Sequence, residues 1–276
     1  MRGIFVTGTD TNVGKTVVAA ATMLRYRDEA PLRYWKPIQT GIRDSGFGIR
    51  TPDGSSFNDD DTSEVARLSR AREHEILARG IRLPDPVSPH LAAQRACTRT
   101  SVRELVAMVW NASHVSHADS RAPDSEFQVA NSEFQVANSE SRIPNPESRV
   151  QSPECRTRWI VEGAGGALVP LNERETMADL MQALDLPVLV VARSALGTIN
   201  HTCMTIEVLR RRRLRVAGVV MVGDRNEENR LAIEKYGAAE VVGQMPWFDP
   251  LTPEALETWA RAEFDRSGVL FVGGLR

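Results

Sequence analysis

The sequence predicts an α/β fold in which helices cover both faces of a doubly wound, mostly parallel sheet. Short apolar, β-branched runs alternate along the chain with longer segments of helical periodicity, which is typical of β–α–β units. Some of these runs, such as Val188–Ala192, are continuously apolar, which suits strands that are buried on both faces. Sheets of this kind bind ligands at the carboxyl ends of their strands, so we expect the chemistry just after each strand.

The individual elements follow from this alternation. The predicted strands are Ile4–Thr7, Arg33–Pro37, Trp159–Glu162, Val188–Ala192, Ala217–Val222 and Val241–Gln244. The predicted helices are Thr16–Arg27, Asp61–Arg70, Ser101–Val115, Met177–Leu184, Asn200–Arg213 and Glu227–Tyr236. With an apolar share of 42% and a charged share of 25%, the composition is ordinary for a globular protein, and we expect a single domain over residues 1–276.

One stretch, about residues 118–156, breaks the alternation. The seven residues Ser-Glu-Phe-Gln-Val-Ala-Asn occur twice in succession from position 125, and degraded copies follow. A period of seven could indicate a coiled coil, but Pro144, Pro146 and Pro153 argue against a continuous helix. The few apolar residues could not offset the entropy of ordering the segment, so we predict a disordered heptapeptide-repeat insertion. A functional tandem motif is the alternative.

Residues 8–16, Gly-Thr-Asp-Thr-Asn-Val-Gly-Lys-Thr, stand between the first strand and the first helix. A loop of small residues, a helix N-terminus and one lysine together suit a phosphate group. The ending Gly14-Lys15-Thr16 matches a P-loop, in which the lysine reaches the phosphates and the hydroxyl binds Mg²⁺. Five residues separate the two glycines, where the general pattern has four. The loop predicts binding of a nucleoside triphosphate, and a plain strand-to-helix turn with an exposed lysine is the alternative.

Further polar residues follow other predicted strands. Lys36 ends the second strand and Thr40 follows it, and two lysines at one edge suit a reaction that gathers negative charge. A surface lysine before a proline turn is the alternative. Glu162 ends the strand of Trp159 and precedes a glycine-rich turn, so it is placed as the acidic residue of a Walker-B strand is placed. A turn that happens to follow a glutamate is the alternative reading.

An acidic run, Asp59-Asp60-Asp61, precedes the second predicted helix. Magnesium is typically held by one or two carboxylates together with phosphates, so this run offers candidate ligands. The run does not choose among its three aspartates, and N-capping of the helix explains an aspartate here equally well.

Two turn segments complete the candidates. Ser88-Pro89-His90 leads into a helix that we expect to begin near Leu91, and a surface histidine is the simpler reading of His90. Leu196–His201 follows a strand and opens a helix whose N–H groups could hold a carboxylate. Helix capping explains this second segment equally well.

Together these residues resemble the dethiobiotin synthetase family. The matching segments occur in the family's order: Gly8–Thr16, Lys36–Gly41, Ser88–His90, Val161–Gly166 and Leu196–His201. The longer glycine spacing is the family's own variant of the P-loop. The resemblance implies a P-loop NTPase type of fold and an ATP-dependent ligase that uses Mg²⁺. Such an enzyme converts 7,8-diaminononanoate, CO₂ (or bicarbonate) and ATP into dethiobiotin, ADP and phosphate, through a carbamate and a phosphorylated carbamate.

The resemblance also implies roles for single residues. The expected catalytic residues are Lys36, Lys15 and Thr11, and the expected metal ligands are Thr16, Asp61 and Glu162. The expected nucleotide-binding residues are Asn12, Val13, Gly14, Lys15, Thr16, Val17, Asp61, Glu162, Gly163, Ala164, Gly165, Asp224, Pro246 and Trp247. The expected substrate-binding residues are Thr40, Lys36, Ser88, Gly163, Leu196, Gly197 and Asn200. Because the 196–200 turn resembles a part that serves a partner subunit, a homodimer is expected.

Two positions depart from the family's pattern. Asn12 stands where many relatives carry Glu, so we assign it no catalytic role. The family's Asn-Asp after the fifth strand is replaced by a segment ending in Gly223-Asp224. Asp224 and the turn Gln244–Trp247 are therefore the candidates for contact with the base.

The bulk properties exclude several classes of partner. A net charge of −2 leaves no overall footprint for nucleic acid, and no apolar run is long enough to span a membrane. Three widely spaced cysteines and no apparent signal peptide favour a reducing cytoplasm. The rival class is a partition-type P-loop ATPase that acts through a protein or DNA. Such proteins carry an extra lysine early in the loop, and Thr9–Val13 contains none.

Overall fold

The computed structural model describes residues 1–42, 49–50, 56–57, 60–114 and 157–271. The predicted insertion, about residues 118–156, lies outside these residues, as does Asp59. The strands are β1 (Gly3–Gly8), β2 (Leu32–Trp35), β3 (Ile38–Thr40), β4 (Ile49–Arg50), β5 (Ser56–Phe57), β6 (Ile76–Leu77), β7 (Ile81–Leu83), β8 (Arg158–Gly166), β9 (Val188–Arg193), β10 (Val216–Val222) and β11 (Val241–Met245). The helices are α1 (Lys15–Tyr26), α2 (Asp61–Ser69), α3 (Pro89–Arg95), α4 (Val102–His114), α5 (Met177–Leu184), α6 (Thr198–Arg211), α7 (Glu227–Gly237) and α8 (Pro253–Ala262), with a 3₁₀ turn at Glu73–Glu75. In this part of the chain no helix is long and apolar enough to cross a membrane.

Seven strands form one sheet in the order β11-β10-β9-β1-β8-β2-β6, and every neighbouring pair is parallel. From β1 the chain runs outward to β2 and β6, returns at β8 beside β1, and then crosses to β9 and the opposite edge. This doubly wound order confirms the predicted fold class. The winding reverses around β1 and β8, and sheets of this kind bind ligands beyond the carboxyl ends of the strands at such a point.

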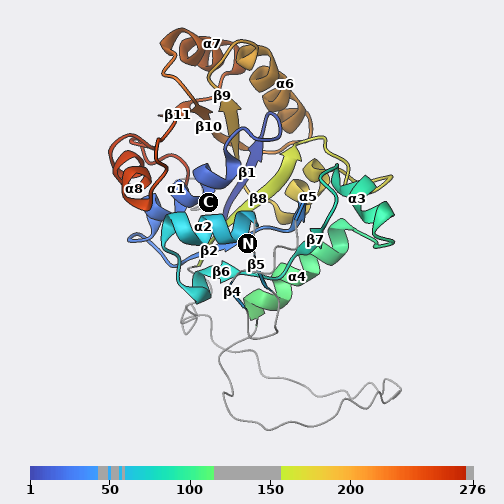
Figure 1. The fold of residues 1–276 in the computed structure, drawn as a ribbon. Helices are drawn as coiled ribbons and strands as arrows, with labels where there is room; N and C mark the ends of the chain where they lie inside the picture. The colour runs from blue at the N-terminus through green and yellow to red at the C-terminus, as the bar shows by residue number, and fades with distance from the viewer. Residues whose placement is uncertain (43–48, 51–55, 58–59, 115–156, 272–276) are drawn as a thin grey trace, which may run out of the picture.

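Helices cover both faces of the sheet, so that the sheet forms the middle of three layers (Figure 1). The side chains of each strand alternate between the two faces, because the side-chain period of a strand is two. On β1, Ile4 and Val6 belong to a core that also includes α1, α2 and α8. Phe5, between them, belongs to the core that includes α4, α5 and α6.

All six predicted strands and all six predicted helices are present, with ends that shift by a few residues. The second predicted strand stops at Trp35 rather than at Pro37, since proline has no N–H to donate to a neighbouring strand. The helix expected near Leu91 begins at Pro89, whose fixed φ suits the first helical turn. The elements that were not predicted are β3 to β7, the 3₁₀ turn and α8.

The amino-terminal edge of the sheet is where β8 begins. The backbone N–H of Arg158 donates to the carbonyl of Pro31, and the next N–H, of Trp159, donates to Arg2. At the same edge the guanidinium of Arg33, on β2, donates to the carbonyl of Ala112 in the last turn of α4. The end of α4 and the start of β8 therefore both attach at this edge, opposite the carboxyl ends of the strands.

Candidate functional site

The P-loop joins β1 to α1. Gly14, the residue before α1, has a φ of 95°, in the left-handed region that favours glycine. No side chain caps α1, so the N–H groups of its first turn are available to an anion. The buried Lys15 folds back across the loop, and its Nζ donates to the carbonyl oxygen of Asp10 at 2.8 Å. The uncapped first turn of α1 and the Lys15 ammonium therefore belong to the same loop, where the sequence predicts a phosphate site.

Four side chains from four segments meet beside the loop, and we call them the charged cluster: Thr16, Lys36, Asp61 and Glu162. Lys36 Nζ lies 2.7 Å from Asp61 Oδ2 and 2.7 Å from Glu162 Oε1. Thr16 Oγ1 lies 3.0 Å from Asp61 Oδ1 and 3.0 Å from Glu162 Oε1. A hydroxyl has a single proton to donate, so Thr16 satisfies one of the two carboxylates at a time. Lys36 also donates to the carbonyl of Gly163 at 3.1 Å.

Burial and charge act in opposite directions on the pKa values of the cluster. Burial alone would lower the pKa of Lys36, but the carboxylates of Glu162 and Asp61 outweigh it and raise that pKa. Burial would raise the pKa of Asp61, yet the Lys36 ammonium and the Thr16 hydroxyl lower it. For Lys15 the balance is the reverse: burial, assisted by the positive charge of Lys36, outweighs the nearby carboxylates and lowers its pKa to about 8. Lys36 is thus held as a cation, whereas Lys15 is poised to gain stability from an anion.

The oxygen atoms of the cluster fit a magnesium ion. Thr16, Asp61 and Glu162 offer one hydroxyl and two carboxylates around a common point, and Mg²⁺ prefers oxygen ligands. Among the described residues no group of three or more His, Cys, Asp or Glu could hold a metal ion. Two carboxylates would suffice for Mg²⁺ only if phosphates supplied further ligands, which agrees with a site built beside a P-loop.

Of the two described residues of the acidic run, Asp60 and Asp61, it is Asp61 that brings its carboxylate to the cluster. Asp60 is the N-cap of α2, and its side chain accepts from the N–H of Thr62. The N–H of Asp61 donates to Gln39 Oε1 at 3.1 Å, which fixes the start of α2 against the segment after Lys36. The structure therefore separates a capping aspartate from its neighbour in the cluster, a choice that the sequence left open.

Two polar residues near the cluster were not predicted. Tyr34, on β2, donates its hydroxyl to Glu162 Oε2 at 2.8 Å. Arg82, on β7, donates to Asp60 Oδ2 at 3.0 Å and to the carbonyl of Lys36 at 3.0 Å. A Cβ on Gly80 would lie 2.4 Å from that carbonyl oxygen and 2.4 Å from the Arg82 guanidinium, so a glycine leaves the room that the contact needs.

A sequence signal existed for one of these two residues. Tyr34 stands two positions before Lys36, and residues two apart on a strand point to the same face. No signal announced Arg82, because the three-residue β7 was not predicted. The guanidinium of Arg82 also reaches Thr62 Oγ1, at 2.9 Å, so it fastens the start of α2 to the main chain at Lys36.

The residues predicted to contact the base lie at the ends of β10 and β11. A Cβ on Gly14 would approach the side chain of Val222 at 3.2 Å, so the P-loop packs directly on the end of β10. A Cβ on Gly223 would lie 3.3 Å from Trp247 Nε1, which places the indole beside the residue that follows β10. Trp247 is 68% exposed, and Asp224 and Pro246 are exposed as well. The exposed indole of Trp247 therefore lies beside Gly223, whose neighbour Val222 packs on the P-loop.

A cavity of about 400 Å³ opens on the other side of the P-loop. It is lined by Thr9, Asp10 and Thr11, by residues 166–170 and by His201, Met204, Thr205 and Val208 of α6. Leu168 and Met204 are more than half exposed, so part of this wall is apolar. Thr11 is the only one of the predicted catalytic residues that lines this cavity.

The remaining predicted substrate residues do not join the charged cluster. Ser88 Oγ lies 3.0 Å from His90 Nδ1, and the N–H of His90 donates to the carbonyl of Pro170, a cavity-lining residue. Thr40 is half-buried on β3. Leu196, Gly197 and Asn200 are exposed at the start of α6, and none of them hydrogen-bonds to the cluster.

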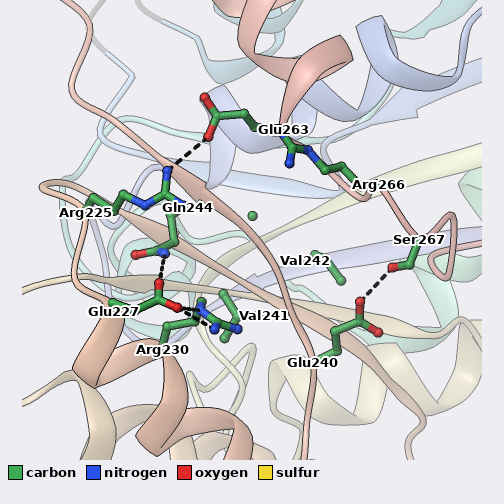
Figure 2. Close-up of a pocket in the computed structure, with 11 residues that line it drawn as sticks. Arg225, Glu227, Arg230, Glu240, Val241, Val242, Gln244, Glu263, Arg266 and Ser267 are labelled. Carbon is green, nitrogen blue, oxygen red and sulfur yellow. Dashed lines mark hydrogen bonds and ion pairs between the residues drawn. The ribbon is translucent and has the colours of Figure 1, made fainter.

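A second cavity, of about 550 Å³, lies along the edge strand β11 (Figure 2), and we call it the edge cavity. It is lined by Arg225, Glu227, Arg230, Glu240, Val241, Val242, Gly243, Gln244, Glu263, Arg266 and Ser267. Figure 2 shows two ion pairs among these residues, Arg230 with Glu227 and Arg225 with Glu263, and a hydrogen bond from Ser267 to Glu240. It contains none of the residues predicted for catalysis, metal or substrate.

The sequence has close relatives among known proteins. A sequence model of a family described as "AAA domain" matches residues 2–119 and 99–255. The chain is 40% identical to the ATP-dependent dethiobiotin synthetase BioD of Paramagnetospirillum magneticum, over 89% of this chain and 88% of that protein. It is 34% identical to the protein of the same name from Agrobacterium fabrum, over 97% and 96%. It is also 33% identical to 43% of the biotin biosynthesis bifunctional protein BioCD of Bordetella avium, over 94% of this chain.

The solved structures found are more distant. A ParA family ATPase from Chlorobium tepidum has a TM-score of 0.47 and 10% identity, over 95% of this chain and 90% of that chain. The MinC:MinD complex of Aquifex aeolicus has a TM-score of 0.47 and 14% identity, over 96% and 93%. Neither value indicates a function.

Proposed function

The chain belongs to the ATP-dependent dethiobiotin synthetase family, and we propose that it closes the ureido ring of dethiobiotin on 7,8-diaminononanoate. It is an ATP-dependent ligase of biotin biosynthesis. The observation that carries the proposed chemistry is the position of Lys36 Nζ, buried 2.7 Å from both Asp61 and Glu162 beside Thr16 of the P-loop. An ammonium fixed there can bind an anionic acceptor next to the phosphates.

The reaction proceeds in three steps. One amine of the diamine forms an N–C bond to CO₂ and loses a proton, which gives a carbamate. A carbamate oxygen then attacks the γ-phosphorus of ATP, and the bond to the β-phosphate oxygen breaks, which releases ADP. The second amine attacks the carbonyl carbon of this mixed anhydride. The new C–N bond closes the ring, the C–O bond to phosphate breaks, and a second proton leaves.

Each charged group of the site has a part in this sequence. The first turn of α1 and Lys15 hold the phosphates, because the nucleotide's charge compensates for the burial of that ammonium. Lys36 holds the carbamate and stabilises the negative charge that builds up during phosphoryl transfer. Thr16, Asp61 and Glu162 would hold Mg²⁺, which supplies charge neutralisation for the phosphates when bound. Because the site holds the carbamate and the phosphates in a fixed orientation, the two anions do not have to meet by diffusion.

The cavity beside Thr11 supports a place for the diamine. Its apolar wall suits the hydrocarbon chain of the diamine, and the hydroxyls of Thr9, Thr11 and Thr205 in its lining suit the polar groups of the diamine. We propose that a second copy of the chain covers this face and forms a homodimer. The exposed side chains of Leu168, Leu196 and Met204 support that proposal, since burying apolar area drives association.

The base of the nucleotide is proposed to lie against Trp247. The exposed indole stands at the end of β11, next to Gly223 and one step from the P-loop. An indole face stacks on any base, so this contact gives affinity without choosing the nucleotide. Asp224 and Pro246, exposed at the same strand ends, complete this side of the site.

The direct test is the complete reaction. The protein is incubated with ATP, MgCl₂, bicarbonate and 7,8-diaminononanoate, and dethiobiotin and ADP are quantified by mass spectrometry. We expect one ADP for each dethiobiotin, and neither product above background without the diamine. ATP hydrolysis that ignores the diamine, with no dethiobiotin formed, would overturn the proposal.

A further inference from the structure

Tyr34 and Glu162 lie on neighbouring parallel strands whose register brings them together. Tyr34 of β2 is the partner of Ile160 of β8, so Glu162 stands two residues further along the same face. A diagonal neighbour at this spacing is within reach of a long aromatic side chain. The hydroxyl of Tyr34 donates to Glu162 Oε2 at 2.8 Å, and both side chains are fully buried. Lys36, two residues after Tyr34, reaches the same carboxylate.

The two oxygens of Glu162 have different partners. Oε1 is shared by Lys36 Nζ at 2.7 Å and Thr16 Oγ1 at 3.0 Å. Oε2 receives the Tyr34 hydroxyl. A carboxylate held at one oxygen by a fixed donor cannot rotate freely, and its other oxygen keeps a constant direction.

We propose that Tyr34 is a positioning residue, which holds Glu162 Oε2 so that Oε1 faces the metal and Lys36. This inference rests on the proposed function, because the role of Glu162 as a metal ligand is part of that proposal. Residues that orient a metal ligand through a hydrogen bond typically alter metal affinity or activity by about 10- to 100-fold when they are replaced. Tyr34→Phe keeps the ring that packs in the core and removes only this donor.

The chain contains a matched control. Tyr26 is buried in the same core, and its hydroxyl donates to the buried carboxylate of Asp265. The carboxylate of Asp265 also accepts from the N–H groups of Val269 and Leu270, so it closes a turn near the carboxyl end of the chain and contacts no P-loop residue. Tyr26→Phe therefore deletes a buried tyrosine–carboxylate hydrogen bond of the same kind away from the site.

The experiment measures metal binding separately from turnover. Binding of Mn²⁺ in the presence of ADP is followed by electron paramagnetic resonance for wild type, Tyr34→Phe, Tyr26→Phe, Glu162→Gln and the double variant Tyr34→Phe/Glu162→Gln. We expect Tyr34→Phe to weaken Mn²⁺ binding by about 10-fold or more. We expect Tyr26→Phe to stay near wild type, and the Tyr34 substitution to add almost nothing once Glu162 is Gln. ADP affinity without metal reports whether each variant keeps a folded site.

Two results would overturn the inference. One is wild-type Mn²⁺ affinity in a Tyr34→Phe protein that still binds ADP. The other is an equal loss of affinity in the presence and absence of the Glu162 carboxylate, because Tyr34 would then act by another route. In turnover, Tyr34→Phe should raise the Mg²⁺ concentration for half-maximal rate and leave the KM for the diamine nearly unchanged. A wild-type protein that binds Mn²⁺–ADP as described but forms no dethiobiotin would instead contradict the proposed function.

Discussion

The charged cluster and the edge cavity both gather basic and acidic side chains, yet they use them differently. In the edge cavity the ion pairs lie near solvent: Arg225 pairs with Glu263 at 3.7 Å, and their side chains are 75% and 43% exposed. In the cluster, Lys36 and Glu162 are 3% and 0% exposed, and one ammonium serves two carboxylates. Exposed pairs are worth about 0–1 kcal/mol, because water solvates the separated charges nearly as well.

Exposed ion pairs and buried, shared charges respond differently when one member is removed. Removing one member of an exposed pair leaves a charge that water can accept. Removing one member of a buried, shared set leaves an uncompensated charge, which is strongly destabilising. A set whose positive charge is outnumbered also attracts a further cation, which the surface pairs do not need. Substitutions in the charged cluster should therefore have larger effects than substitutions in the edge cavity, and measuring both tests this contrast.

The largest effect is expected for Lys36→Ala. Loss of the ammonium that holds the carbamate should reduce the rate of dethiobiotin formation by about 10³-fold, the scale of a lost charge-stabilising donor. ADP affinity should change little, since Lys15 and α1 hold the phosphates. Steady-state kinetics and equilibrium titration with a fluorescent ADP analogue measure the two quantities. Equal losses in both would contradict the assigned role of Lys36.

The second prediction concerns how the affinity for ADP depends on pH through Lys15. Burial lowers the pKa of this lysine to about 8. Bound phosphates favour the protonated amine and raise its pKa in the complex. Binding therefore takes up a proton above pH 8, and affinity should fall by up to about tenfold per pH unit there, but stay nearly level below pH 7. Calorimetric titration of ADP in buffers of different ionisation enthalpy measures both affinity and proton uptake. A level affinity through pH 9 would refute it.

A smaller effect is expected for Arg82→Lys. Lysine keeps the positive charge but lacks the planar fork that reaches Asp60, Thr62 and the Lys36 carbonyl together. We expect a loss of about 1–3 kcal/mol in unfolding free energy, the scale of a buried polar group left without its partner. Turnover should fall because the start of α2 carries Asp61. Urea unfolding and steady-state kinetics measure both, and an unchanged rate in a destabilised protein would limit Arg82 to a structural role.

The smallest effect is expected for Arg225→Ala in the edge cavity. Its exposed partner, Glu263, remains solvated after the substitution, so the unfolding free energy should change by less than about 1 kcal/mol. The rate of dethiobiotin formation should be indistinguishable from wild type. A clear fall in rate would mean that the edge cavity takes part in the reaction, and the contrast between the two regions would fail.

Much of the fold could be predicted because long periodic segments announce themselves. The strands that begin at Val188 and Val216 contain continuous apolar runs, and the helix between them, α6, buries one face. The two-residue β6 and the three-residue β7 are too short to show a period, and their pairing is decided by neighbouring strands. Helix α8 did carry a signal that was missed: Thr252 caps it and Pro253 opens it.

The site divides in the same way. Lys15 could be identified from the glycine-bounded loop that follows the first strand, and Glu162 from its place at the end of the predicted strand that begins at Trp159, because the topology brings such positions to the same end of the sheet. The acidic run alone did not choose among its aspartates, because capping and metal binding favour the same residue type. The family resemblance selected Asp61, and the structure places its carboxylate in the cluster, whereas Asp60 caps α2. Tyr34 and Arg82 act through contacts between segments that are distant in sequence, and such contacts depend on register and on strands too short to predict.

The attachment of α4 and β8 at the amino-terminal edge has a consequence for how this chain can change in length. The described residues that flank positions 115–156 attach at the edge of the sheet opposite the carboxyl ends of the strands. The paired strands β2 and β8 are not free to change length. One residue gained or lost within β2 or β8 would turn Tyr34, Lys36 or Glu162 to the opposite face of the sheet. The number of residues within β2 and β8 is therefore fixed by the site that they carry.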